Sequence, residues 1–186
     1  KKNNEKYLKN CGIIWDDSTK EASLRYLFVN SNVVLIYGAA GTGKTTLINH
    51  ISNMMRQSTK LYLTKTHTAL QNVQRHLTYK DDNYKFAIID SITRSNSMVN
   101  SDIVFVDECS TIDNRTMKEL LCKIDKGTML VLSGDIYQIE SIDFGNWFYY
   151  AKNIIKRKGA VIELQHTWRT NNEKLKSLWN EVREKN

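Results

Sequence analysis

The sequence contains 186 residues with a net charge of +7, from 27 Lys and Arg against 20 Asp and Glu, and it is 41% hydrophobic and 25% charged. These values are typical of one soluble globular domain with a buried core, and no apolar run approaches the ~20 residues that a membrane span requires. The basic balance fits a polyanionic partner such as nucleic acid, and it fits a Lys- and Asn-rich proteome equally well.

The cysteines and the ends of the chain give information about the cellular environment and the length of the protein. Cys11, Cys109 and Cys122 are odd in number and lack close pairing, which argues against a disulfide framework and a zinc site. We find no secretory type of leader, so we expect a reducing, cytoplasmic environment and no membrane partner. The chain starts at Lys1 without an initiating Met and ends at Asn186 within a predicted helix, so we expect a piece of a longer protein.

Residues 1–30 are predicted as a polar lead-in, and residues 31–186 as one domain. In the lead-in, the run from Asp17 to Ala22 has helix-start chemistry, and apolar residues then recur at helical spacing. A helix is therefore expected over about 18–29, just before the first strand of the domain.

Residues 38–45 fit the phosphate-binding pattern G-x-x-x-x-G-K-[ST] without a mismatch. An apolar, β-branched run at 33–37 predicts a buried parallel strand before the loop, and a helix follows it to about residue 57. The loop's glycines allow its backbone amides to point at a phosphate beside a helix N-terminus. A chance glycine-rich turn is the alternative. The expected nucleotide-binding residues are Gly38, Ala39, Ala40, Gly41, Thr42, Gly43, Lys44, Thr45 and Thr46.

The remaining pattern alternates short apolar strands with amphipathic helices. Further strands are predicted at 61–63, 86–89, 103–106, 129–132 and 160–164. Helices are predicted from about 68 to 77, from Asp113 to Gly127, over 144–156 and over 171–184, with polar loops at 80–85 and 94–101, the second expected to be mobile. This alternation indicates the α/β class, as a three-layer P-loop NTPase whose mostly parallel sheet is flanked by helices.

Two acidic residues follow the predicted fourth strand. At the carboxyl end of a strand beside a phosphate loop, Asp107 is placed to hold Mg²⁺ together with the hydroxyl of Thr45. Glu108 is placed to deprotonate the attacking water, and Lys44 to reach the β- and γ-phosphates. A polar strand end that caps a helix is the alternative interpretation.

Three weaker signals lie at other strand ends. Gln138 follows the fifth strand and has the neutral donor and acceptor groups that sense water or a γ-phosphate, although a surface turn explains it as well. Arg169 follows the sixth strand and suits an arginine finger, or a surface arginine stacked on Trp168. Hydroxyls and amides in the loop after the second strand suit a nucleic-acid backbone, or a capped helix start. The residues concerned in that loop are Thr64, Thr66 and His67.

Taken together, these segments resemble the first RecA-like motor domain of superfamily-one helicases, most closely the 5′-to-3′ branch that contains RecD-like enzymes. The resembling motifs are I at 38–45, Ia at 64–69, Ib at 87–92, II at 106–110, III at 134–139 and IV at 164–169. The resemblance implies ATP and Mg²⁺ as cofactors, single-stranded nucleic acid as a partner, expected to be DNA, and a second RecA-like domain in the full-length chain. It implies an ATP-dependent DNA helicase, with an exodeoxyribonuclease V alpha-like protein as one form.

The sequence also departs from that family. Thr19 stands where the family often has a glutamine that reads adenine, Asp90 stands where it usually has a histidine, and residues 139–141 replace its usual prolines. Motifs V and VI, which belong to the second motor domain, are absent, so this part alone is expected to hydrolyse nucleotide slowly. Two rival functions stay open, a small-molecule kinase and a nucleotide-gated nucleic-acid-binding module without helicase activity.

Overall fold

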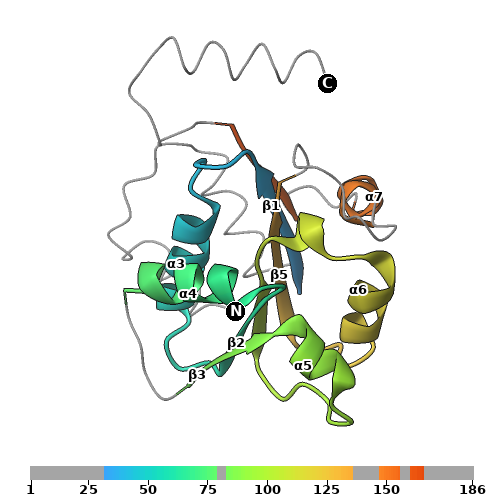
Figure 1. Cartoon of the computed structure of the whole chain (residues 1–186). Coiled ribbons are helices and arrows are strands. Elements are labelled where there is room, and N and C mark those ends of the chain that lie inside the picture. The colour runs from blue at the N-terminus through green and yellow to red at the C-terminus, as the bar shows by residue number, and fades with distance from the viewer. Residues whose placement is uncertain (1–31, 79–82, 136–146, 156–159, 166–186) are drawn as a thin grey trace.

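The computed structural model describes residues 32–78, 83–135, 147–155 and 160–165, and within them six strands form one sheet in the order β3-β2-β4-β5-β1-β6. All five strand pairings are parallel (Figure 1). The strands are β1 (Val33–Gly38), β2 (Lys60–Thr64), β3 (Tyr84–Ile88), β4 (Ile103–Val106), β5 (Met129–Gly134) and β6 (Val161–Leu164). The parallel α/β sheet predicted from the alternating pattern is therefore confirmed.

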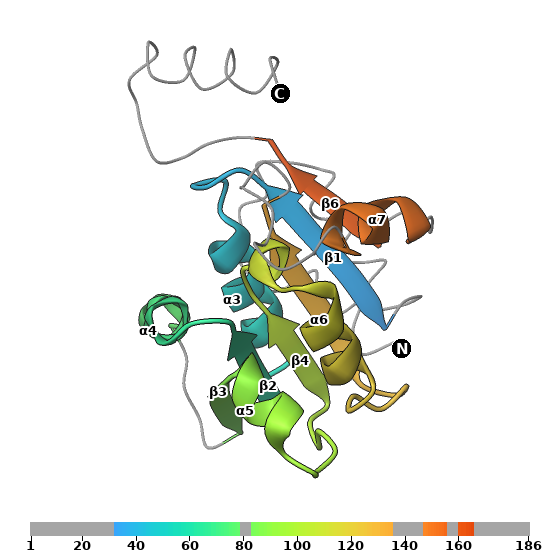
Figure 2. The ribbon, with the colours of Figure 1, turned by 45° about the vertical axis from the view of Figure 1, so that its right-hand side comes forward.

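Helices cover both faces of this sheet. On one face lie α3 and α4, and on the other lie α5, α6 and α7, as Figures 1 and 2 show from two directions. The helices are α3 (Lys44–Met54), α4 (His67–His76), α5 (Ile89–Arg94), α6 (Asn114–Leu121) and α7 (Trp147–Ile154), with a short 3₁₀ helix η1 (Cys109–Thr111). The three-layer P-loop architecture follows from this arrangement.

Strands β1, β4 and β5, inside the sheet, are largely apolar on both sides because each side packs against helices. The core on the α3 side includes Ile36 and Ile48, and the core on the opposite side includes Leu35 and Leu120, all with 4% exposure or less. Such continuous burial explains why the strand sequences show no alternation of apolar and polar residues.

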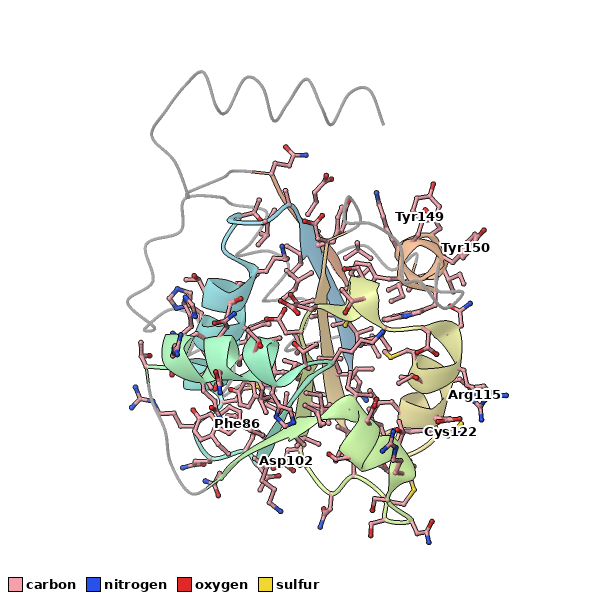
Figure 3. The ribbon with its side chains drawn as sticks, viewed as in Figure 1. Phe86, Asp102, Arg115, Cys122, Tyr149 and Tyr150 are labelled. Atoms are coloured by element: carbon pink, nitrogen blue, oxygen red, sulfur yellow. The ribbon has the colours of Figure 1, made fainter. Side chains whose placement is uncertain are left out.

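An aromatic stack joins three neighbouring strands on the α3 side. The ring of Tyr62 in β2 lies 4.7 Å from that of Phe105 in β4 and 5.2 Å from that of Phe86 in β3, which Figure 3 labels. The Tyr62 hydroxyl donates a hydrogen bond of 2.6 Å to Ser52 in α3, which also contacts the Tyr84 hydroxyl. This stack fixes α3, and the loop that precedes it, against the sheet.

Three sequence predictions are wrong in detail. Strand β3 ends at Ile88, because Ile89 is fully buried at the start of α5, a helix the sequence did not predict. The segment expected to be a mobile loop is held at Val99, which is 8% exposed and pairs with Ile124. Gly127 does not end α6, which stops at Leu121; instead its amide donates to the Asp125 carboxylate within a turn.

Other predictions lie outside the described residues, namely the helices over 18–29 and 171–184. Asp113 caps α6 as expected, accepting a hydrogen bond of 2.8 Å from the Thr116 amide. Among the described helices, none combines the length and the hydrophobicity that crossing a membrane requires.

Candidate functional site

The phosphate loop joins β1 to α3 at the carboxyl edge of the sheet. Gly41 and Gly43 have φ of 81° and 87°, a left-handed conformation that favours glycine. Thr42 closes the turn, with its hydroxyl donating to the Ala39 carbonyl at 2.8 Å. Gly43 is the N-cap of α3 and no side chain of the described residues caps it, so the first amides of the helix are available to an anion.

Gly38 lies where the loop leaves β1, under the end of β6. A Cβ at this position would be 2.4 Å from the Leu164 carbonyl oxygen and 2.8 Å from the Thr42 hydroxyl. Leu164 is also the register partner of Gly38 across the two parallel strands. The first glycine of the motif is therefore required by the close approach of β6 as well as by the loop.

Lys44 places a positive charge directly on the loop. Its ammonium donates to the carbonyls of Gly38 at 2.8 Å and Ala39 at 2.9 Å, while its backbone begins α3. The side chain is half-buried, so the surrounding protein strengthens its attraction for a phosphate over that of a fully solvated lysine.

Thr45 and Asp107 meet between α3 and the end of β4. The Thr45 hydroxyl lies 3.4 Å from a carboxylate oxygen of Asp107, whose side chain is buried and whose amide donates to the Leu63 carbonyl. Adjacent oxygens of an octahedral Mg²⁺ site lie about 3 Å apart, given bonds of about 2.0–2.1 Å. A hydroxyl and a carboxylate at this separation fit that cation.

Glu108 adopts a left-handed backbone, with φ of 55°. Its amide donates to the Asp107 carboxylate at 3.0 Å, and its carbonyl accepts from both the amide and the hydroxyl of Thr111. Desolvation by the surrounding protein raises the pKa of Glu108, the neighbouring Asp107 charge raises it further, and the Lys44 ammonium opposes both. A carboxylate with a raised pKa is a better general base.

The end of β5 is tied to the turn that follows Glu108. The Asp135 amide donates to the Ser110 hydroxyl at 3.3 Å, and both residues are buried. Gly134 permits the close approach of α7 at this strand end, because a Cβ there would lie 2.6 Å from the ring of Phe148. The sequence placed Ser110 in motif II without giving it a role and did not single out Thr111, whose position close after the acidic pair was the available signal.

The loop after β2 contains the three residues predicted to contact nucleic acid. Thr64 is fully buried and its hydroxyl donates to the Thr66 carbonyl at 2.9 Å, so its side chain supports the loop from within. Thr66 and His67 are exposed, and the Thr66 hydroxyl caps α4 by accepting from the Ala69 amide. The helix-cap interpretation of Thr66 is therefore confirmed, and its contact with nucleic acid stays a prediction.

The structure brings together the residues of the loop and the acidic pair from separate strand ends. Gln138, Arg169 and Thr19 lie outside the described residues. The chain leading to two of them is described, since β5 and β6 flank β1 on its two sides and end at the same edge as the phosphate loop.

The family model described as an AAA domain matches residues 18–186. An uncharacterized protein of Methanocaldococcus jannaschii, MJ1519, is 30% identical over 189 residues, a match that covers 87% of this chain and 16% of that protein. The chain thus spans a small part of the curated relative it matches.

Several solved Pif1 helicases share the fold. A structure of two coordinating Pif1 helicases at forked double-stranded DNA gives a TM-score of 0.65 at 14% identity, over 92% of this chain and 48% of that chain. Bacteroides Pif1 with ADP-AlF3 and single-stranded DNA gives 0.65 at 12%, over 92% and 47%. Candida albicans Pif1 gives 0.55 at 19%, over 92% and 44%. The predicted RecA-like P-loop fold is confirmed, and the chain spans under half of these proteins.

Proposed function

Because the chain belongs to the AAA domain family, we propose that it is the ATP-binding and ATP-hydrolysing motor domain of an ATP-dependent DNA helicase. The observation that carries this proposal is the convergence of Lys44, Thr45, Asp107 and Glu108 at one edge of the parallel sheet. Ligands of such sheets bind at that edge.

The proposed roles follow from the chemistry of each group. The loop amides and the Lys44 ammonium bind the phosphates, and Thr45 with Asp107 holds Mg²⁺, which neutralises charge on the phosphates when bound. Glu108 accepts the proton of the attacking water, a task that its raised pKa favours. Gln138 and Arg169 would sense the γ-phosphate and stabilise the transition state, roles that rest on the sequence motifs.

Nucleic acid is the proposed partner. The solved relatives include Pif1 bound to single-stranded DNA, and the chain carries a net charge of +7. Thr66 and His67 are exposed beside the N-terminus of α4, where a backbone phosphate can bind, while Thr64 orients the loop. A second RecA-like domain in the longer protein would close the ATP cleft. We place the protein in the cytoplasm and, from the resemblance of its motifs taken together, in the RecD-like branch.

The two alternative functions predict different responses to ATP and DNA. A small-molecule kinase needs an acceptor site and does not respond to DNA, and a nucleotide-gated module binds ATP without turnover. The intact set of Lys44, Thr45, Asp107 and Glu108 favours a hydrolytic enzyme over the module.

The test is ATP hydrolysis by the full-length protein, with and without an unstructured poly(dT) strand. We expect hydrolysis stimulated by the strand in the wild type. Glu108→Gln should keep binding of a fluorescent ATP analogue and lose turnover, because an amide cannot accept the proton. ATP hydrolysis that ignores DNA would refute the helicase proposal, and wild-type turnover by Glu108→Gln would remove Glu108 as the base.

A further inference from the structure

One lysine joins the proposed nucleic-acid loop to the proposed catalytic base. The Lys65 ammonium, in the loop after β2, donates a hydrogen bond of 2.7 Å to the Thr111 carbonyl in η1. Thr111 in turn donates twice to the Glu108 carbonyl, from its amide at 3.0 Å and from its hydroxyl at 2.8 Å. One hydrogen bond from Lys65 to Thr111 and a pair from Thr111 to Glu108 therefore connect residues that are 43 positions apart (108 − 65) in sequence.

The turn that begins with Glu108 is fixed on its inner side. Cys109 is fully buried and its thiol donates to the Val106 carbonyl at 3.0 Å. The carbonyl of the buried Ile112 accepts a hydrogen bond of 2.7 Å from the Trp147 indole. Thr111 lies between these anchors, and its carbonyl is bound by the exposed side chain of Lys65. The outer side of the turn thus depends on a contact that solvent and ligands can reach.

The backbone conformation of Glu108 explains why the contact between Lys65 and Thr111 matters for the proposed catalytic base. A non-glycine residue with φ of 55° is in a sparsely populated conformation, which persists only where its surroundings hold it. The two bonds from Thr111 to the Glu108 carbonyl are part of that restraint. Loosening Thr111 therefore allows Glu108 to relax and its carboxylate to move away from the water it must activate.

We propose that Lys65 is a positioning residue that couples a nucleic-acid strand in the loop after β2 to ATP hydrolysis, acting on Glu108 through Thr111. The proposal rests on the function proposed above. An ammonium has three N–H donors, and a strand phosphate beside Thr66 can take one while Thr111 keeps another. A phosphate bound in this way restrains the long, exposed side chain of Lys65 and so stabilises its hydrogen bond to the Thr111 carbonyl.

The Lys65 charge also contributes to the pKa of Asp113, at the start of α6. Burial raises the pKa of Asp113, but hydrogen bonds from the Thr116 amide and hydroxyl, together with the Lys65 ammonium, lower it overall. The Lys65 ammonium therefore binds the Thr111 carbonyl, and its charge also acts on the Asp113 carboxyl. This position suits a residue that links a ligand to a turn.

The test uses the full-length protein with saturating poly(dT), comparing Lys65→Met, Lys65→Arg and the control Lys118→Met, which removes an exposed lysine from α6. We expect Lys65→Met to lower the stimulated kcat roughly five- to tenfold with the KM for ATP unchanged. Lys65→Arg should restore most of the rate, and Lys118→Met should match the wild type. Melting temperatures identify any variant that fails to fold.

A double-mutant cycle with Thr111→Val separates the proposed link from a simple phosphate contact. Valine keeps the shape of Thr111 and removes its hydroxyl bond to Glu108, so the two changes should be non-additive in kcat. Additive effects would overturn the link. A Lys65→Met protein that binds poly(dT) more weakly but reaches the wild-type kcat at saturation would overturn it too.

The two proposals fail in distinguishable ways. A wild-type protein whose hydrolysis is not stimulated by poly(dT) refutes the proposed function, and the link with it. Stimulation that is intact in the wild type and equally intact in Lys65→Met refutes the link alone.

Discussion

Replacing Gly38 by alanine tests whether β6 and the phosphate loop are built as one unit. The added methyl would lie 2.4 Å from the Leu164 carbonyl oxygen, a backbone atom held in the parallel pairing with β1. It would also lie 2.8 Å from the Thr42 hydroxyl, which closes the loop. Real Cβ contacts are not this short, so either β6 or the loop must shift.

The expected cost of Gly38→Ala is about 1–3 kcal/mol in the free energy of unfolding, the usual range for overpacking a tight site. Gly127→Ala is the matched control, because its methyl would meet only the Asp125 carboxylate at 3.2 Å, in an exposed turn. That change should alter stability by less than about 1 kcal/mol in either direction.

Urea denaturation of both variants measures the difference, and titration with a fluorescent ATP analogue measures the effect on the loop. Gly38→Ala should be the less stable variant and should bind the analogue more weakly. Equal midpoints for the two variants, with wild-type affinity in both, would refute the argument from the Gly38–Leu164 contact.

Three further predictions concern charged groups. Lys44→Ala should weaken binding of an ATP analogue by roughly 10- to 150-fold, the value of a hydrogen bond to a charged group, and calorimetry that finds wild-type affinity would count against its phosphate contact. In a pH profile of kcat/KM, the acidic limb should fall above the ordinary glutamate pKa of about 4.3, because only ionised Glu108 accepts a proton and its pKa is raised; a limb at or below that value would oppose this role. Hydrogen bonds from the amide and hydroxyl of Thr59 lower the pKa of Asp102, so its contribution to stability is complete above the unfolded pKa of about 3.9 and is lost as the pH falls through the lower folded value. Asp102→Asn should therefore reduce stability at neutral pH and make the urea midpoint less sensitive to acid, and an unchanged acid dependence would contradict this.

The sequence predicted most of the fold because its signals were local. The buried strands are continuous apolar runs, and the phosphate loop has fixed residues at fixed spacing, so β1, the loop and α3 could be placed directly. The acidic pair could be placed for a related reason. It follows β4, and the carboxyl ends of parallel strands share an edge, so its meeting with Thr45 was predictable.

The remaining features depend on contacts between distant segments. Helix α5 is six residues long, too short for a recognisable period, and it forms because Ile89 is buried by the fold. Gly127 is a residue type that often follows the end of a helix. Here its amide instead donates to the Asp125 carboxylate in a separate turn. The hydrogen bond from Lys65 to Thr111 joins the loop after β2 to η1. Neither residue has a sequence pattern that predicts the other as its partner.

The position of β6 makes it one of the two edge strands of the described sheet, and the shorter of them. Among the described strands, β6 alone, with four residues, lies between β1 and one edge of the sheet, whereas β4 and β5 have neighbours on both sides. Short edge elements have lower free energies of local unfolding than central ones, so their amide hydrogens exchange sooner with solvent. Since Leu164 packs on Gly38, a nucleotide that binds only the closed loop raises the free energy of opening at this edge. Deuterium uptake by the amides of β6 should therefore slow as nucleotide fills the phosphate loop, and so it measures how much of the loop is occupied by nucleotide.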